Sequence, residues 1–140
     1  MKRFFRYIRR FFELPWKEKL FFCEAVFFLL TAKLMLLALP FRICVKTIAP
    51  HNCSEQPTID VLKQVKSAIA RANRLSFWKN VCLVQSFAAR WMLQRRKINS
   101  TLSIGIKKDP EMKISAHAWL MAGNFYIVSG AKDFQIIMNY

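Results

Sequence analysis

Residues 99–128 read NSTLSIGIKKDPEMKISAHAWLMAGNFYIV, and within them the hydrophobic pattern changes its period. Upstream of Asn99 the apolar side chains recur at helical spacing, whereas downstream they alternate with polar residues, as in a half-buried strand. The period of two predicts strands at 102–106, 114–120, 125–128 and 134–138. A predicted three-residue turn, Ala122-Gly123-Asn124, joins the second and third strands. Helices followed by such an antiparallel meander predict an α+β fold.

Two helices are predicted before these strands. The first is capped by Thr58 and ends near Leu75, with its apolar residues on one face. The second begins near Asn80 and continues to about Lys97. A polar connector at 49–57 precedes both helices. We therefore predict two regions, which are a basic, apolar helical arm with its connector at 1–57 and a compact core at 58–140.

The N-terminal arm is both basic and apolar. Residues 1–12, MKRFFRYIRRFF, predict a basic amphipathic helix that packs either on the core of the domain or on a membrane surface. The apolar run Leu20–Leu39 is long enough to span the hydrocarbon core of a bilayer, about 30 Å thick. Glu24 and Lys33 interrupt it, however, and each would cost about 2.5–3.5 kcal/mol near the middle of a span. A core helix is therefore favoured over a membrane span, and a cleaved signal peptide is disfavoured because the run begins late and is too long.

Composition and charge narrow the class of protein. The chain has 140 residues, of which 54% are hydrophobic, and this is enough to bury a core and to exclude intrinsic disorder. Against 8 Asp and Glu there are 23 Lys and Arg, a formal net charge of +15. Such a charge suits nucleic acid, an anionic membrane or an acidic protein partner. Nucleic acid is not predicted as a partner, because the sequence has no helix-turn-helix, zinc-finger or RNP-like run.

The cysteines indicate a reducing compartment. They are Cys23, Cys44, Cys53 and Cys82, and the absence of a C-x-x-C pair argues against a zinc ribbon or a disulfide scaffold. His51 and Cys53 form at most half of a metal site, because a structural zinc ion needs four convergent ligands. We therefore predict no metal and no other cofactor.

Cys82 and His117 are the candidate catalytic residues. Cysteine nucleophiles act as thiolates, which the N-terminus of a helix stabilises, and Cys82 lies two residues after the predicted N-cap Asn80. His117 lies on the second predicted strand, where it could serve as the base. Residue type and placement alone leave the alternative open that both are ordinary core residues.

Four motifs carry a resemblance to a known family. They are Asn80-Val-Cys-Leu-Val-Gln-Ser86, Leu93-Gln-Arg-Arg96, Leu102-Ser-Ile-Gly-Ile106 and Ala116-His-Ala-Trp-Leu120. Together they resemble the transglutaminase-like cysteine peptidases of lasso-peptide biosynthesis, which are similar to the C-terminal domain of the microcin-processing B protein. The apolar helix that ends in Leu39-Pro-Phe-Arg42 resembles the arm of the stand-alone protease subunits of this family. The resemblance implies a transglutaminase- or papain-like core with a nucleophile helix packed on an antiparallel sheet.

Carried over by position, the resemblance makes Cys82 the nucleophile and His117 the general base. Members of the family often place an Asp twelve residues after the histidine, and here Ser129 occupies that position. A three-residue hairpin turn would set Ser129 opposite His117. Asp133, the nearest downstream carboxylate, and a main-chain carbonyl are the other groups that could orient the imidazole. The sequence leaves these three alternatives open.

The resemblance further implies a leader peptidase that removes the leader from a ribosomally made lasso-peptide precursor. Such an enzyme acts with a leader-recognition protein, expected here in trans, and upstream of an ATP-dependent lasso cyclase that forms the macrolactam. The expected location is the cytoplasm, with peripheral membrane contact by the arm left open. The rival hypothesis is a non-catalytic, basic protein that lies on or is anchored in a membrane.

Overall fold

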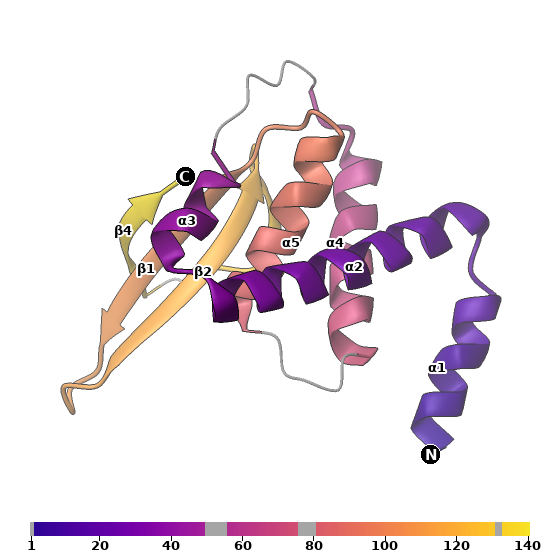
Figure 1. The fold of residues 1–140 in the computed structure, drawn as a ribbon, viewed down its shortest axis with the longest axis horizontal. Helices are drawn as coiled ribbons and strands as arrows, with labels where there is room; N and C mark the ends of the chain where they lie inside the picture. The colour runs from indigo at the N-terminus through magenta and orange to yellow at the C-terminus, as the bar shows by residue number, and fades with distance from the viewer. Residues whose placement is uncertain (1, 50–55, 76–80, 131–132) are drawn as a thin grey trace.

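The computed structural model describes residues 2–49, 56–75, 81–130 and 133–140, and the structural statements below concern these residues (Figure 1). Helices precede strands along the chain, so the α+β class is confirmed. The helices are α1 Lys2–Phe12, α2 Trp16–Ala38, α3 Phe41–Lys46, α4 Ile59–Leu75 and α5 Cys82–Arg95. The strands are β1 Thr101–Lys108, β2 Ile114–Ala122, β3 Phe125–Val128 and β4 Gln135–Asn139.

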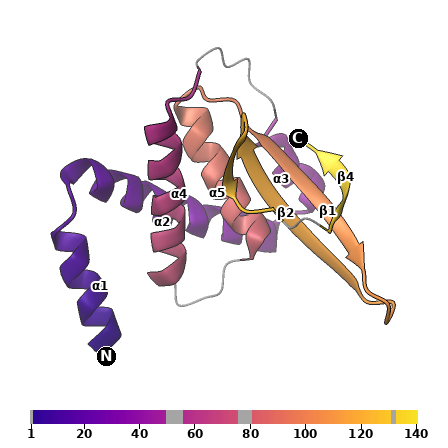
Figure 2. The same cartoon turned by 180° about the vertical axis from the view of Figure 1, so that it is seen from behind.

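The central helix of the core is α5. It packs against β2 and β3 of the sheet and against α2 and α4, and in both views α2 crosses α4 and α5 (Figures 1 and 2). Phe87, Met92 and Leu93 are fully enclosed. A helix that is covered on nearly every side needs apolar or small residues all round, which explains why this segment shows little amphipathic pattern.

The sheet has the order β3-β2-β1-β4. Strands β1, β2 and β3 form the predicted meander, but β4 does not continue it beside β3 and instead pairs antiparallel with the free edge of β1. Two backbone hydrogen bonds of 2.9 Å between Leu102 and Tyr140 anchor the chain end on β1. The edge of β3 is taken by α4, from which Lys66 Nζ donates to the carbonyl of Tyr126 at 2.9 Å. The last strand thus pairs with β1, which has eight residues, rather than with β3, which has four.

The hairpin between β2 and β3 differs from the prediction. Ala122 pairs with Phe125, so the turn has two residues, and Gly123 supplies the positive φ of 57° that it needs. An irregularity between Leu120 and Met121 shifts the register again. The predicted three-residue turn, and the ladder pairing of position 129 with position 117 that it implied, are therefore wrong.

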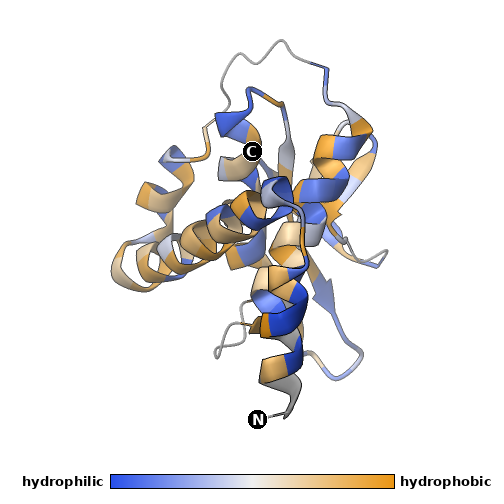
Figure 3. Ribbon diagram, turned by 90° about the vertical axis from the view of Figure 1, so that its right-hand side faces the viewer, coloured by the Kyte–Doolittle hydropathy of each residue, from blue (hydrophilic) through white to orange (hydrophobic). Residues whose placement is uncertain are grey.

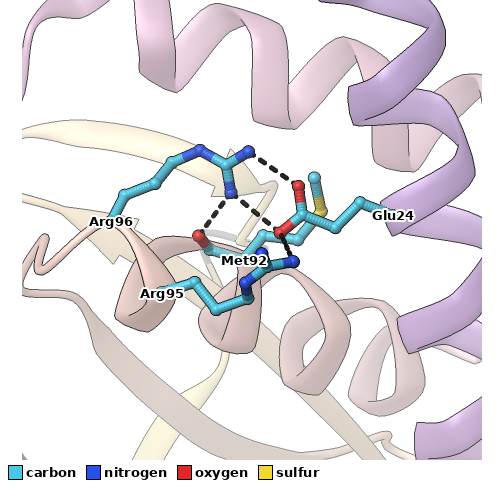
Figure 4. A network of polar contacts seen from close by, with 4 residues as sticks. All are labelled: Glu24, Met92, Arg95 and Arg96. Atoms are coloured by element: carbon cyan, nitrogen blue, oxygen red, sulfur yellow. Dashed lines mark hydrogen bonds and ion pairs between the residues drawn. The ribbon is translucent and has the colours of Figure 1, made fainter.

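Ion pairs attach α2 to the core. Glu24 Oε2 lies 2.6 Å from Arg96 Nη2, and its Oε1 accepts from Arg96 at 2.9 Å and from Arg95 at 3.2 Å (Figure 4). Arg71 of α4 lies 2.6 Å from Glu18 at the start of α2. The acidic residue within the apolar run thus joins α2 to the end of α5.

Only one face of α2 is buried. Ala25, Leu29 and Ala32 are buried where α2 packs on α4 and α5, whereas large apolar side chains on the opposite side are exposed. The ribbon of this helix is coloured mostly as hydrophobic (Figure 3). Among the described helices, α2 alone is long and apolar enough to cross a membrane. The predicted core helix therefore packs on the domain while keeping a second apolar face.

Candidate functional site

Cys82 is the first residue of α5. Its N-cap is Val81, in an extended conformation, so the helix begins one residue later than predicted; Asn80, the expected cap, lies outside the described residues. The thiol is half-buried and free, and the backbone N–H of Ala118 donates to its Sγ at 3.4 Å. Strand β2 thus approaches the end of α5 where the helix N–H groups are unpaired and the dipole is positive.

His117 lies on β2, one residue before the N–H that contacts the thiol. Its ring stacks on Trp119, with the centroids 6.1 Å apart, and lies 5.5 Å from the ring of Phe134. Its Nε2 is 2.9 Å from the main-chain carbonyl oxygen of Ser129. A carbonyl only accepts hydrogen bonds, so Nε2 carries the proton of the neutral ring and Nδ1 keeps the free lone pair.

This contact selects one of the three orienting groups. Ser129 reaches the imidazole through its main chain rather than through the hydroxyl, because the chain leaves β3 at Val128 and turns its carbonyl toward β2. The carboxylate of Asp133 is exposed and lies 3.3 Å from Lys107 Nζ, so it is engaged elsewhere. The main-chain alternative is the one that the geometry supports.

A cavity of about 230 Å³ brings the two candidate residues together. Apart from Cys82 and His117, every side chain on its wall is apolar: Phe41, Leu83, Ile104, Ala116, Ala118 and Met138. These residues come from α3, α5, β1, β2 and β4. The thiol and the imidazole therefore share an open, apolar hollow at the N-terminus of α5, an arrangement that suits nucleophilic attack on a bound carbonyl.

The sequence profile of the transglutaminase-like superfamily matches residues 28–139. The chain belongs to this superfamily. No curated protein and no solved structure gives a significant match. The superfamily match begins inside α2 and includes α3, so it extends across the predicted division at residue 57, which stays a prediction.

Two residues of this transglutaminase-like site were missed from the sequence. Phe41 follows Pro40 on α3, a helix of six residues that is too short to show a period. Gly105 pairs with His117 across the sheet, and a Cβ there would lie 2.8 Å from the Trp119 ring and 3.0 Å from the carbonyl oxygen of Gln135. Only glycine lets Trp119 and β4 approach this closely. A glycine in the middle of a strand pattern is the signal that could have indicated this close approach.

The described residues show no cluster of three or more His, Cys, Asp or Glu side chains that could hold a metal. His51 and Cys53, the half-site considered from the sequence, lie outside the described residues. Arg90 is the buried cation nearest the site in sequence, and its Nη1 donates to the carbonyls of Ser100 and Tyr140 at 3.0 and 2.5 Å. Burial lowers the pKa of this guanidinium below its usual value. Arg90 thus ties α5 to Ser100 and to Tyr140.

Proposed function

We propose that this chain is a cysteine peptidase that removes the leader from a ribosomally made lasso-peptide precursor. The observation that carries the proposal is the thiol of Cys82 at the start of α5, beside β2, in one cavity with an imidazole whose Nε2 is bound by a main-chain carbonyl. Membership of the transglutaminase-like superfamily, which includes cysteine peptidases, supports the reaction class. The four sequence motifs support the narrower assignment to lasso-peptide maturation.

In the proposed reaction, Nδ1 of His117 accepts the thiol proton and Cys82 Sγ attacks the carbonyl carbon of the leader–core bond. Backbone N–H groups at the start of α5 donate to the oxyanion of the tetrahedral intermediate. The imidazolium returns its proton to the amine of the core peptide, which leaves, and the leader stays on sulfur as a thioester. Water, deprotonated by the same imidazole, then releases the leader as a carboxylic acid and restores the thiol.

The carbonyl of Ser129 holds Nε2–H and so fixes the tautomer that this proton transfer needs. A neutral carbonyl supplies less stabilisation to the imidazolium than a carboxylate does. The site therefore depends more heavily on orientation of the ring by Trp119 and Phe134, which hold it in place from β2 and from the segment before β4.

The substrate and its partners follow from the same proposal. The precursor is delivered by a leader-recognition protein in trans, and the freed core passes to an ATP-dependent lasso cyclase in the cytoplasm. The net charge of +15 favours docking of an acidic leader or partner. The apolar wall of the cavity favours apolar groups next to the cleaved bond.

The test is incubation of the precursor with this chain and its recognition partner, followed by mass spectrometry of the products. Cys82→Ala and His117→Ala should abolish release of the core peptide. Cys23→Ala is the matched control, because this cysteine is exposed on α2 and should leave the rate unchanged. Undiminished cleavage by Cys82→Ala would refute the proposal.

The exposed apolar face of α2 favours a second candidate, a membrane-surface protein without catalysis. The same assay separates the two candidates. A chain that cleaves the precursor without lipid removes the non-catalytic alternative, and a chain that is inert with every precursor but binds lipid supports it.

A further inference from the structure

The outer face of α2 carries a continuous row of exposed apolar side chains, which we call the α2 stripe. Its members are separated alternately by four and three residues and comprise Trp16, Leu20, Phe27, Leu30, Leu34 and Leu37, with Cys23 filling the remaining position. Their exposed fractions range from 40% at Leu30 to 76% at Leu37. The stripe follows the helix for about 31 Å at 1.5 Å per residue. An exposed apolar surface of this extent on a soluble domain indicates an interaction site.

Charged residues surround this stripe in an unbalanced way. The acids of this part of the chain are Glu13, Glu18 and Glu24, and each is already paired with an arginine of the same chain. Exposed cations outside these pairs lie before the stripe, along it and after it in the sequence: Arg6, Arg10, Lys17, Arg42 and Lys46. The segments before and after the stripe, which we call its charged border, therefore carry an excess of positive charge, and the occupant that complements it is anionic.

The same charges argue against a second copy of the chain as the occupant. A homodimer through the stripe would bring two positive borders together with no spare carboxylate among the described residues of the arm to offset them. An anionic phospholipid surface matches both the apolar stripe and its positive charges. It accepts apolar side chains below its headgroups, and the headgroups attract Lys and Arg. Trp16 at one end of the stripe suits the headgroup level.

The opposite face of α2 determines the orientation of the helix. It is packed on α4 and α5 through Ala25, Leu29 and Ala32, and it carries the ion pairs of Glu24 (Figure 4). A spanning orientation would carry these helices and their charges into hydrocarbon, where unsatisfied polar groups are costly.

We propose that α2 lies in the plane of an anionic membrane, with its stripe at the boundary between headgroups and acyl chains and the domain on the aqueous side. This inference does not depend on the proposed peptidase activity, because it rests on the stripe and its charged border alone. Helix α1 also exposes apolar side chains, those of Phe5 and Phe12.

The test is flotation of the purified full chain with vesicles of phosphatidylcholine, either alone or with one quarter phosphatidylglycerol. Wild-type chain should float with the anionic vesicles and bind the neutral ones at least tenfold more weakly. The double variant Phe27→Ser/Leu34→Ser should lose about tenfold or more in affinity for the anionic vesicles, because each side chain loses apolar contact with the bilayer. Met112→Ser, in the exposed turn between β1 and β2, is the matched control and should bind like wild type.

A second readout locates the lipid contact on the molecule. Cys23 lies on the stripe and is exposed, so anionic vesicles should slow its alkylation by a water-soluble maleimide, read by peptide mapping. Leu37→Ser, at the most exposed position of the stripe, provides a milder variant in case the double variant does not fold. Unchanged flotation of folded stripe variants, unprotected Cys23, or a lipid-free dimer that the variants abolish would each overturn the proposal.

Discussion

Replacing Glu24 with Gln should destabilise the domain more than any other exchange of an acid for its amide on α2. The carboxylate is only 11% exposed and contacts both guanidiniums at the end of α5, with oxygen–nitrogen distances of 2.6–3.2 Å. Gln keeps the shape and one acceptor, but its NH2 group turns a donor toward an arginine and removes the negative charge. Arg95 and Arg96 are then left as neighbouring cations without a counter-ion.

The size of the effect follows from the exposure of each partner. Breaking a fully buried ion pair costs about 3–5 kcal/mol, but Arg96 keeps 25% of its side chain in water, which reduces its share to about 2 kcal/mol. Arg95 is 66% exposed and adds about 0.5 kcal/mol at most. A total of about 2–3 kcal/mol, at an m value of about 2 kcal/mol/M, lowers the urea midpoint by about 1–1.5 M.

The assay is urea unfolding followed by circular dichroism and tryptophan fluorescence. Glu13→Gln is the matched control, because its i,i+4 pair with Arg9 is exposed and should contribute only about 0.3–0.5 kcal/mol. A double-mutant cycle of Glu24→Gln with Arg96→Gln should give a coupling energy of about 1–2 kcal/mol. Equal urea midpoints for Glu24→Gln and Glu13→Gln would show that the ion pairs of Glu24 with Arg95 and Arg96 do not hold α2 on the core.

Four further substitutions test the site and its support. Gly105→Ala should cost about 1–3 kcal/mol in urea unfolding and lower the cleavage rate at least tenfold, because the new methyl overlaps Trp119 and displaces the ring of His117 that stacks on it. Ser129→Ala and Asp133→Asn should each leave the cleavage rate within about threefold of wild type, since the ring is held by a carbonyl that both variants retain. Arg90→Met should lower stability by about 2–4 kcal/mol in the same unfolding assay, because two carbonyls lose a charged donor.

Each of these predictions has an outcome that contradicts it. A Gly105→Ala protein with the urea midpoint and the cleavage rate of wild type would mean that β4 can move away from residue 105 at little cost. A large loss of activity in folded Asp133→Asn would return the carboxylate to the orienting role. An Arg90→Met protein as stable as wild type would mean that packing at this position compensates for the lost hydrogen bonds, as in buried ion pairs replaced by apolar residues.

The fold class was predictable because it depends on local periods. The strands begin and end within about two residues of their predicted bounds. The buried face of α4 follows directly from the helical spacing of its apolar residues. The position of β4 was not predictable in this way. A period of two shows that residues form a strand, but the choice between the edges of β1 and β3 depends on tertiary contacts such as Leu102 with Tyr140.

The candidate site likewise has a part that the sequence predicts and a part that depends on tertiary structure. Cys82 and His117 were accessible from residue type, predicted elements and motif resemblance, and the structure places them on one cavity. The group that orients the imidazole could not be predicted from the sequence, because a main-chain carbonyl has no residue type to recognise. Its position also depends on a two-residue turn and an irregular register that the predicted turn did not contain.

The arm contributes to the site as well as to the surface. Phe41, three residues beyond the end of α2, forms part of the cavity wall, and Glu24 on α2 holds the C-terminal end of the helix whose first residue is Cys82. Removal of the arm would therefore take away a wall of the cavity and uncover the face of α5 that α2 buries. Docking of α2 on a membrane would in turn fix the height and direction of the cavity relative to the lipid, because α2 is packed against α5, whose first residue is Cys82. The proposed membrane contact of the stripe and the proposed chemistry at Cys82 are thus linked by the packing of α2 on α5, and a variant that loosens α2 from α5 should weaken both.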